Sequence, residues 1–587
     1  MATGATATEG GERQAGRKIL VCVAWPYASG VRHVGHMAAY IPSDVFARYH
    51  RMRGDDVLMV SGSDMHGTPV TIAADKEGKP VEEVAMHFHD VIVDGFNRLG
   101  MVYDLYTHTH TPNHERVTQG VFLDLLSKGY LFTQVSEQMY DPEARRFLPD
   151  RYVEGTCPYC GYADARGDQC DNCGRTLDPT DLLHPRSRFT GATPELRETE
   201  HFFLDLPQFT DQLLAWIERQ GAHWRPNARR FTENWIREGL RARAITRDLD
   251  WGVPIPVPGY EDKRIYVWFD AVIGYLSASI EWAQLRGDPD AYKAWWQLDE
   301  AGNAPSRAYY FMGKDNIPFH TIIWPAMLMG LGGLTLPYDV PAVEYMLLND
   351  AKISTSRGIV VTVPDYLSRY DADPLRYFVI ANAPETRDSS FTWGEFFRRN
   401  NDELVATYGN LANRVLSLTQ RYGGGAVPEP GVLDDDDQTT LAAARDAFAA
   451  VGADIEGVHL KDALAKTIAL AASFNRYLER KKPWETGKTD PPRTMTTLWV
   501  AVQGLSALRV LTAPFMPFSA QQLHLLLGGE GGNADGTGGG VASLPWAYIE
   551  LPTGTALPKP KPLFKKLDDT QLETELERLR ERFGDGA

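Results

Sequence analysis

The sequence predicts an α/β protein: a Rossmann-like domain on a parallel sheet, interrupted by a metal-binding insertion and followed by an all-α bundle. Apolar runs rich in β-branched residues alternate with helical patterns in the first and third parts of the chain. Two CxxC pairs in a polar, Gly-rich stretch separate those parts. From about residue 392 to residue 527 the pattern is helical with few strand signals.

Length and composition indicate a cytoplasmic protein of several domains. The chain has 587 residues, with 43% apolar and 23% charged content, which is ordinary for globular proteins. No stretch approaches twenty uninterrupted apolar residues, so we expect no membrane span. The small, polar first sixteen residues predict a disordered lead. A net charge of −17 argues against nonspecific coating of nucleic acid. For the oligomeric state, which the sequence does not fix, we favour a monomer.

The first apolar run leads into a candidate anion site. Ile19 to Ala24 predicts a buried parallel strand, Gly30 helps to end it, and a helix is predicted from Arg32 onward. Free N–H groups and the helix dipole at such a turn favour anions. His33 and His36 share one face there and can donate to phosphate oxygens, while Gly35 leaves room for a flat base. The alternative is a strand-to-helix corner with two solvated histidines.

A second stretch, AKISTSRG at 351–358, supplies cations and hydroxyls beside a glycine. Its composition suits a loop that binds a polyphosphate. The alternative is an ordinary basic surface turn. The polar residues of the stretch are Lys352, Ser354, Thr355, Ser356 and Arg357.

Further strands and helices complete the predicted sheet. Asp56–Ser61 predicts a second strand that runs into Asp64, at the strand end where open α/β sheets bind ligands. The later strands are expected at 264–270, 309–313 and 340–348, and the helices at 81–99, 112–128, 207–220 and 226–241.

Four cysteines carry the strongest local signal. Cys157 and Cys160 form one pair, and Cys170 and Cys173 form the other. Two such knuckles complete a tetrahedral shell for Zn²⁺ with no open position, so the site is expected to be structural. The alternatives are an iron–sulfur cluster or reduced, empty cysteines. Cys22 stands apart, and we expect it in the core.

The pair of motifs, HVGH at 33–36 and KISTS at 352–356, resembles the two signatures of class I aminoacyl-tRNA synthetases. With its neighbours, from about Lys18 to about Pro517, the chain resembles the methionyl-tRNA synthetase family. The resemblance implies a Rossmann-like catalytic domain with a zinc-bearing connective insertion, and an anticodon-binding α-bundle. It also implies ATP-dependent attachment of L-methionine to tRNA(Met) through a methionyl-adenylate, with Mg²⁺ accompanying ATP.

The resemblance assigns the site residues. His33, His36 and Lys352 are expected to be catalytic, and to bind ATP with Gly35, Ser354, Thr355 and Ser356. The segment beginning at Asp64 resembles the family's DxHGTP motif, with Asp64 near the substrate ammonium. The implied methionine pocket is Trp25, Tyr27, Asp64, Trp268, Ala271, Tyr275 and His320. The alternative is that these aromatic residues are simply core, and it applies above all to Trp268 and Trp324.

In the bundle, the resemblance implies that the anticodon is bound by Asn410, Arg414 and Trp484, where an exposed indole would stack on a base. The alternative is helix-packing polar residues and a capping Trp. Residues 528–540 predict a flexible linker, and 567–583 a charged helical tail whose purpose the sequence does not reveal.

These inferences divide the chain into seven segments. They are the lead at 1–16, the first half of the catalytic domain at 17–115, the connective domain at 116–250, the second half at 251–345, the loop and stem-contact region at 346–391, the anticodon-binding domain at 392–550, and the tail at 551–587.

Three positions depart from the family pattern. Thr355 replaces a lysine of the usual KMSKS loop, Trp25 stands where a leucine is usual, and Val272 stands where one branch has proline. Thr355 removes one cation, so Lys352 is expected to do more of the phosphate binding, whereas Trp25 and Val272 bear on the choice of amino acid rather than on the reaction class. The alternatives to methionine attachment are a class I synthetase for another apolar amino acid, and a non-catalytic tRNA-binding regulator.

Overall fold

A parallel sheet forms the centre of the molecule. The computed structural model describes residues 16–149, 152–167, 170, 172–173, 177–348, 361–533 and 539–583. The sheet has the order β14-β13-β1-β2-β3, with β15 paired to β13, and all its pairs are parallel. Its strands are β1 (Lys18–Val23), β2 (Asp56–Ser63), β3 (Leu105–His108), β13 (Arg307–Gly313), β14 (Pro337–Asp339) and β15 (Ala342–Val343).

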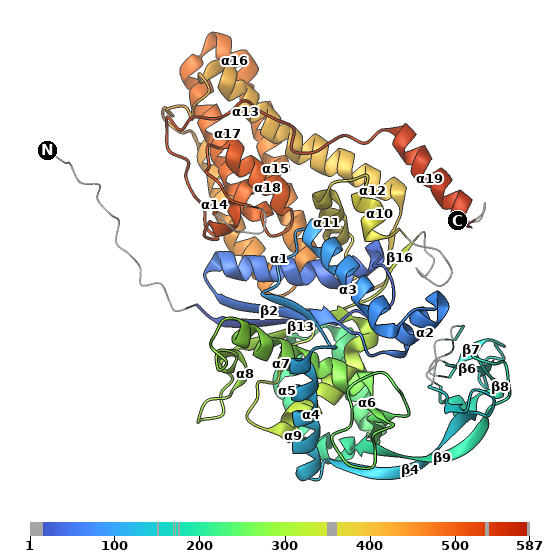
Figure 1. The fold of residues 1–587 in the computed structure, drawn as a ribbon. Helices are drawn as coiled ribbons and strands as arrows, with labels where there is room; N and C mark the ends of the chain where they lie inside the picture. Colours follow the sequence, from blue (N-terminus) through green and yellow to red (C-terminus); the bar gives the residue numbers. More distant parts are fainter. Residues whose placement is uncertain are drawn as a thin grey trace.

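Helices cover both faces of this sheet (Figure 1). Ile19, Val21 and Val23 of β1 face the core shared with the bundle, while Leu20 and Cys22 face the second core. Both faces are buried, which explains why β1 is apolar throughout. On the bundle side lie α1 (Met37–Arg53), α3 (Val81–Arg98) and α11 (Ala372–Ala381); on the other lie α4 (Pro112–Ser127), α7 (Val267–Leu285), α8 (Lys293–Trp296) and α9 (Trp324–Leu331).

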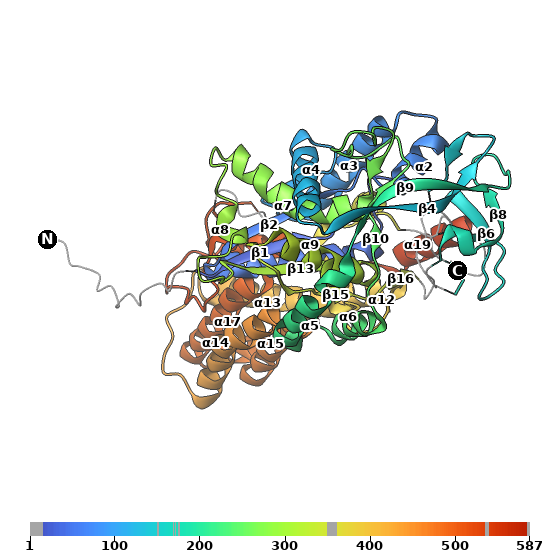
Figure 2. The same ribbon diagram turned by 90° about the horizontal axis from the view of Figure 1, so that it is seen from below.

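The insertion extends from the sheet as a long two-stranded ribbon. Strands β4 (Leu131–Asp141) and β9 (Glu195–Leu204) pair antiparallel along their length. The cysteines lie at its far end, beside a small sheet of β6 (Val153–Thr156), β7 (Ala165–Arg166) and β8 (Leu183–Ser187). Figure 2 shows the ribbon crossing the molecule towards this sheet. The ribbon is followed by α5 (Thr210–Gln220), α6 (Pro226–Glu238), β10 (Arg243–Ala244) and β11 (Thr246–Arg247).

The C-terminal part is helical, as the sequence predicts. After β16 (Met346–Leu348), α10 (Val363–Leu367) and β17 (Ser389–Phe391), it contains α12 (Trp393–Arg399), the π-helix η9 (Asn400–Gly409), α13 (Asn410–Tyr422), α14 (Asp435–Glu456), α15 (Leu460–Lys481), α16 (Pro483–Thr489), α17 (Pro491–Thr512) and α18 (Pro517–Leu526). The tail returns across the bundle and ends in α19 (Asp569–Phe583), which packs against α12. No helix in the described ranges is long and apolar enough to cross a membrane.

Two predicted strands are wrong in part. Only Arg264–Ile265 (β12) is extended, and α7 already begins at Val267. A short apolar run does not distinguish a buried strand from the first turns of a buried helix. The strand expected at 340–348 is instead divided between β15 and β16. The segment boundaries proposed from the sequence stay predictions.

One buried arginine joins the sheet to the bundle. The Arg376 guanidinium donates to Asp44 Oδ2 at 2.6 Å, to Leu99 O at 3.2 Å, and to the carbonyl oxygens of Pro514 and Phe515 at 2.9 Å each. Both Arg376 and Asp44 are fully buried. Burial opposes ionisation of Asp44, but two arginines, one of them Arg376, outweigh burial and lower its pKa. The planar guanidinium therefore connects three separate parts of the chain, at Asp44, at Leu99 and at Pro514–Phe515.

We predict that Arg376→Ala destabilises the protein by about 3–5 kcal/mol, because it leaves the Asp44 carboxylate buried with one cation fewer and three carbonyls without this donor. Urea unfolding should be followed by two spectroscopic probes, one placed in the bundle and one in the domain of the parallel sheet. Arg398→Ala is the matched control: Arg398 is half exposed in its pairs with Glu395 and Glu403, so about 1 kcal/mol or less is expected. Equal losses in the two variants would contradict the prediction.

Candidate active site

The turn after β1 presents two stacked histidines. His33 caps the short 3₁₀ helix Val34–His36: its Nδ1 accepts from the His36 N–H at 3.2 Å, and His36 Nδ1 accepts from the His33 N–H at 3.1 Å. The two ring centroids lie 3.4 Å apart. The turn follows the central strand where the strand order reverses, the usual ligand position in an open α/β sheet.

These contacts determine which nitrogen carries the proton. Each Nδ1 accepts a backbone hydrogen bond, so each neutral ring is protonated at Nε2. Burial, then the nearby Arg32, lowers the pKa of His33 to about 3. Burial, with Arg32 also nearby, lowers the pKa of His36 as well. Two neutral imidazoles thus hold Nε2–H donors that have no hydrogen-bond partner among the described residues. A phosphate oxygen is a suitable acceptor for both.

The backbone around the histidine turn is tightly held. Arg32 donates to Tyr27 O at 3.0 Å and to Gly30 O at 2.8 Å, which closes the preceding turn. The Val34 N–H donates to Val361 O, and the Val363 N–H donates to Arg32 O, each at 2.9 Å. Val361 is the first residue described after the KISTS stretch. Lys352, Ser354, Thr355 and Ser356 themselves lie outside the described residues.

Asp64 lies beside Tyr27 just past the sheet. The Asp64 N–H donates to Pro26 O and the Ala28 N–H to Asp64 O, both at 2.8 Å, so the segments after β1 and β2 remain paired. The Asp64 side chain is buried and has no cationic partner among the residues described. Burial, then the negative charge of Asp270, raises its pKa well above the usual value. A ligand ammonium would satisfy this carboxylate.

A second carboxylate near Asp64, Asp270, was not predicted from the sequence, and it organises two histidines. Asp270 is fully buried on the first turn of α7, where it bonds His66 Nδ1 at 2.7 Å and also His114 Nε2. Burial opposes its ionisation, but His114 and His66 outweigh burial and lower its pKa to about 2. A lone acid inside the apolar run 265–273 is the signal that could have revealed it.

The expected amino-acid pocket brings aromatic side chains together. The rings of Trp25 and Tyr275 lie edge to face, 6.5 Å apart, and the Tyr275 O–H donates to His320 Nε2 at 2.6 Å. His320 Nδ1 donates to Asn316 O at 2.8 Å, and burial lowers the pKa of His320 to about 4, so the ring is neutral. Both side chains are therefore fixed in one orientation.

The remaining predicted pocket residues lie on α7 and in the segment after β1. Trp268 and Ala271 are spaced to share the α7 face that bears Tyr275, and the half-buried Trp268 ring lies 4.8 Å from the Phe319 ring. The Tyr27 ring packs directly on Gly67. Val272, by contrast, is buried in the core.

Two glycines make a slot for Trp25. A Cβ at Gly62 or at Gly274 would come within 2.7 Å of the indole ring. Gly62 lies on β2 and Gly274 on α7, so the ring is held between the sheet and the helix. The buried indole Nε1 has no hydrogen-bond partner within the described part of the chain. A glycine inside a strand, as at Gly62, is the sequence signal of such close approach.

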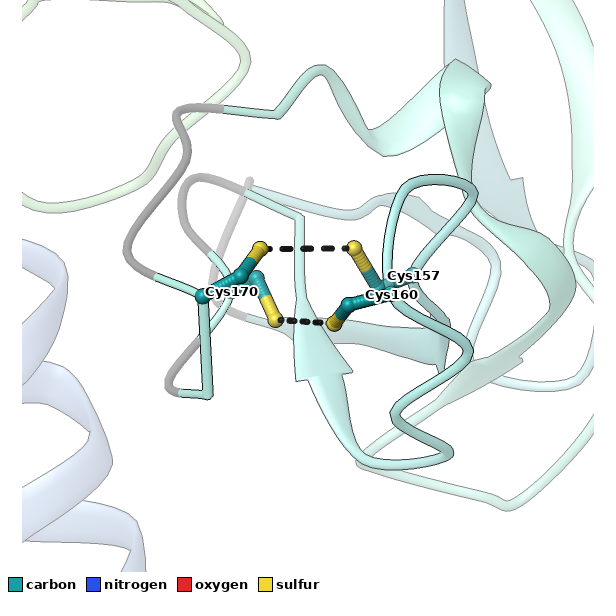
Figure 3. A group of neighbouring side chains, drawn as sticks. Cys157, Cys160 and Cys170 are labelled. Atoms are coloured by element: carbon teal, nitrogen blue, oxygen red, sulfur yellow. Dashed lines mark hydrogen bonds between the residues drawn. The ribbon is translucent and has the colours of Figure 1, made fainter.

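The four cysteines converge as predicted. The Cys157 and Cys173 sulfurs lie 3.9 Å apart, the Cys160 and Cys170 sulfurs 3.6 Å apart, and all four lie within 4.8 Å of one another (Figure 3). A tetrahedron of sulfurs about 2.3 Å from a central ion has edges of about 3.8 Å, so the group fits a metal ion.

The insertion docks on α2 (Thr68–Glu77), where the Tyr152 hydroxyl bonds Thr71 and Asp75 at 3.0 Å each.

Two of the predicted anticodon residues, Arg414 and Trp484, are in contact. The Arg414 guanidinium lies over the Trp484 ring, 5.2 Å from its centroid, and donates to Glu479 at 2.7 Å. Trp484 is the second residue of α16 and is half-buried, rather than exposed as expected. Asn410 is exposed on the first turn of α13.

A parallel sheet that presents anion donors at its switch point defines an α/β nucleotide-binding protein. Residues 19–416 match the family model "tRNA synthetases class I (M)", and residues 427–585 match "Anticodon binding domain of methionyl tRNA ligase". The chain therefore belongs to the methionyl-tRNA synthetase family.

Similar proteins extend over nearly the whole chain. The methionine–tRNA ligase of Roseiflexus castenholzii is 54% identical, covering 96% of this chain and 98% of that protein. That of Thermobifida fusca is 48% identical, covering 97% and 99%. The methionyl-tRNA synthetase of Mycobacterium tuberculosis, solved with methionyl-adenylate, has a TM-score of 0.75 at 26% identity, covering 93% of this chain and 99% of that one.

We predict that Gly274→Ala displaces Trp25 and destabilises the protein by about 1–3 kcal/mol, the usual cost of overpacking. Urea unfolding and the fluorescence of the folded state should both change. Gly120→Ala is the control: Gly120 is also inside a helix, α4, but its added Cβ meets nothing within 4 Å. A helical Gly→Ala change at that open position should be neutral or stabilising by up to about 1 kcal/mol. Similar behaviour of the two variants would refute the slot.

Proposed function

We propose that this chain attaches L-methionine to tRNA(Met) in two steps. The methionine carboxylate attacks the α-phosphorus of ATP, which yields methionyl-adenylate and pyrophosphate. The 3′-terminal ribose hydroxyl of the tRNA then attacks the methionyl carbonyl, and AMP leaves. The carrying observation is the stacked pair His33 and His36, with neutral Nε2–H donors at the switch point of the sheet. Neither alternative, a synthetase for another apolar amino acid or a non-catalytic regulator, is favoured by the relatives.

In this proposal the protein mostly positions the reactants and stabilises charge. His33 and His36 donate to ATP phosphate oxygens, and Gly35 leaves space for the adenine. Lys352 binds the departing pyrophosphate, with Ser354, Thr355 and Ser356 as hydroxyl partners. Mg²⁺ bound with ATP would neutralise further phosphate charge.

The pocket geometry supports methionine as the amino acid. Asp64 would ionise on pairing with the substrate ammonium, because the cation offsets the burial that raises its pKa. The edge-to-face rings of Trp25 and Tyr275 suit a thioether, since sulfur contacts ring edges favourably. Tyr27, Trp268, Ala271 and His320 complete the proposed wall. An apolar pocket discriminates by only ~1–3 kcal/mol per methylene, so its fixed shape matters.

We assign Zn²⁺ to the four cysteines, because four thiolates at tetrahedral spacing leave no open coordination position. The ion would then hold the tip of the insertion rather than contact the substrates. At the other end of the molecule, Asn410, Arg414 and Trp484 are the proposed contacts to the anticodon. The half-buried indole would offer its free edge or face to a base.

We predict that ATP–pyrophosphate exchange depends on methionine and slows by roughly 10²–10³-fold in His33→Ala, the scale of losing one transition-state donor. Lys352→Ala should have a similar effect, and Thr355→Ala a much smaller one. His33→Asn keeps a capping acceptor, so this variant should fold like the wild type and still lack normal exchange. His87→Ala, at an exposed position on α3, is the control. Faster exchange with leucine, isoleucine, valine or cysteine would overturn the assignment.

We predict about one zinc per chain by elemental analysis. Cys170→Ala should lower both the zinc content and the melting temperature while methionine-dependent exchange at low temperature persists. Cys22→Ala is the control, because Cys22 lies in β1, away from the cluster, and should leave the zinc content unchanged. Iron in place of zinc, or four free thiols without metal, would reject the assignment.

A further inference from the structure

The C-terminal tail carries a row of exposed lysines on a rigid support. Between the bundle and α19 the chain reads LPKPKPLFKKL, residues 557–567, here called the strap. Its apolar side chains, Leu557, Leu563, Phe564 and Leu567, are buried in the bundle-side core. Its four lysines, Lys559, Lys561, Lys565 and Lys566, are all exposed. The strap is thus two-sided, with anchors inward and cations outward.

Side-chain amides of the helices hold the strap backbone. Gln420 of α13 donates to Leu557 O at 2.6 Å, and Gln522 of α18 donates to Pro562 O at 3.0 Å. Asn400 donates to Lys565 O at 3.0 Å. Asn401 both donates to Leu567 O, at 2.7 Å, and accepts from the Leu567 N–H, at 3.0 Å. These bonds, with three prolines inside the strap, fix the backbone before any partner binds.

The strap carries four lysines and no acidic residue. The whole protein has a net charge of −17. Of the four lysines, Lys565 alone has an ion pair within the described ranges, with Asp371 at 3.1 Å, and both side chains are largely exposed. Such a pair is weak and easily exchanged. A positive stripe on an acidic protein attracts polyanions locally and disfavours nonspecific binding elsewhere.

The strap runs from the proposed anticodon contacts towards the part of the molecule that carries the histidine turn. It begins beside α13, the helix that carries Asn410 and Arg414. It ends at α19, where the buried Glu575 accepts from Arg369 Nε at 2.7 Å and from the Tyr370 hydroxyl at 3.0 Å. Arg369 follows α10, the helix whose first N–H bonds the histidine turn. Figures 1 and 2 both place α19 near β16, and β16 packs against the 3₁₀ helix Val34–His36 of that turn.

We propose that the strap is a phosphate track for the tRNA backbone between the anticodon and the acceptor end. The proposal rests on the proposed function. A tRNA whose anticodon meets the bundle and whose 3′ end reaches His33 and His36 must cross this side of the molecule. In an extended chain at ~3.1 Å per residue, Lys559 to Lys566 cover ~20 Å, room for several phosphates. Lysines act here as point charges that position the tRNA and read no sequence.

The test is the salt dependence of tRNA binding. Lys559→Gln with Lys561→Gln, Lys565→Gln with Lys566→Gln, and all four changes together should be titrated with tRNA(Met) over a salt series. The slope of log affinity against log salt should fall by about 0.7–0.9 for each lysine that contacts a phosphate. The loss should be equal for tRNAs with matched and altered anticodons. Lys→Arg variants at the same positions should keep the wild-type slope.

Matched controls separate this effect from general charge. Arg286→Gln with Lys293→Gln also removes two exposed cations, but from the end of α7 and from α8, on the opposite face of the sheet. That variant should keep the wild-type slope and affinity. Melting temperatures should be unchanged in all variants, because the exposed lysines make no buried contact.

Exchange measured without tRNA on the same preparations distinguishes the two proposals. Lack of methionine-dependent exchange in the wild type would defeat the proposed function. Normal exchange with a wild-type salt slope in the fourfold variant would defeat the strap proposal alone. A loss confined to tRNAs with the matched anticodon would also defeat it, because the strap would then act through anticodon reading.

Discussion

The buried guanidinium of Arg376 is the interaction on which the relation between the two halves of this protein depends. It binds the Asp44 carboxylate in α1 and the carbonyls of Leu99, Pro514 and Phe515, so the sheet side and the bundle are joined at one group. Arg48 adds a second cation to Asp44 at 2.8 Å. Charges this deep are stable only when every lone pair and proton is engaged. The position of the bundle relative to the histidine turn is therefore a consequence of a satisfied polar network, not of apolar packing alone.

In the candidate site, too, the partners of the buried polar groups decide what each group can do. The turn of His33 and His36 uses each Nδ1 to satisfy a backbone N–H, which leaves each Nε2–H for a ligand. Asp270 satisfies two histidines and remains ionised, whereas Asp64, close to it, has no cation among the described residues. Two carboxylates in one wall thus have opposite environments. The one without a cation is the one suited to a cationic substrate group.

Much of the fold and of the candidate site could be predicted, because the sequence patterns that indicate them are local. The apolar run of β1, the histidine pair and the two CxxC pairs each depend on residues close in the chain, and the described structure confirms the strand and brings the four cysteines together. The run at 264–270 predicts a strand but mostly forms a helix, because a strand and the first turn of a buried helix share the same apolar composition. Trp484 was expected to be exposed, but packing against Arg414 and the bundle buries part of it. Periodicity does not report such contacts.

The sequence by itself determined the family, the parallel sheet, the cysteine cluster and the position of the histidine turn, because each follows from residue types at short spacing. Only the tertiary structure decided that Trp25 fits between Gly62 and Gly274, that Asp270 holds His66 and His114, and that the strap lies along the bundle. These contacts join residues tens to hundreds of positions apart. Whether such groups meet depends on how whole elements pack, and the same local pattern is compatible with many packings.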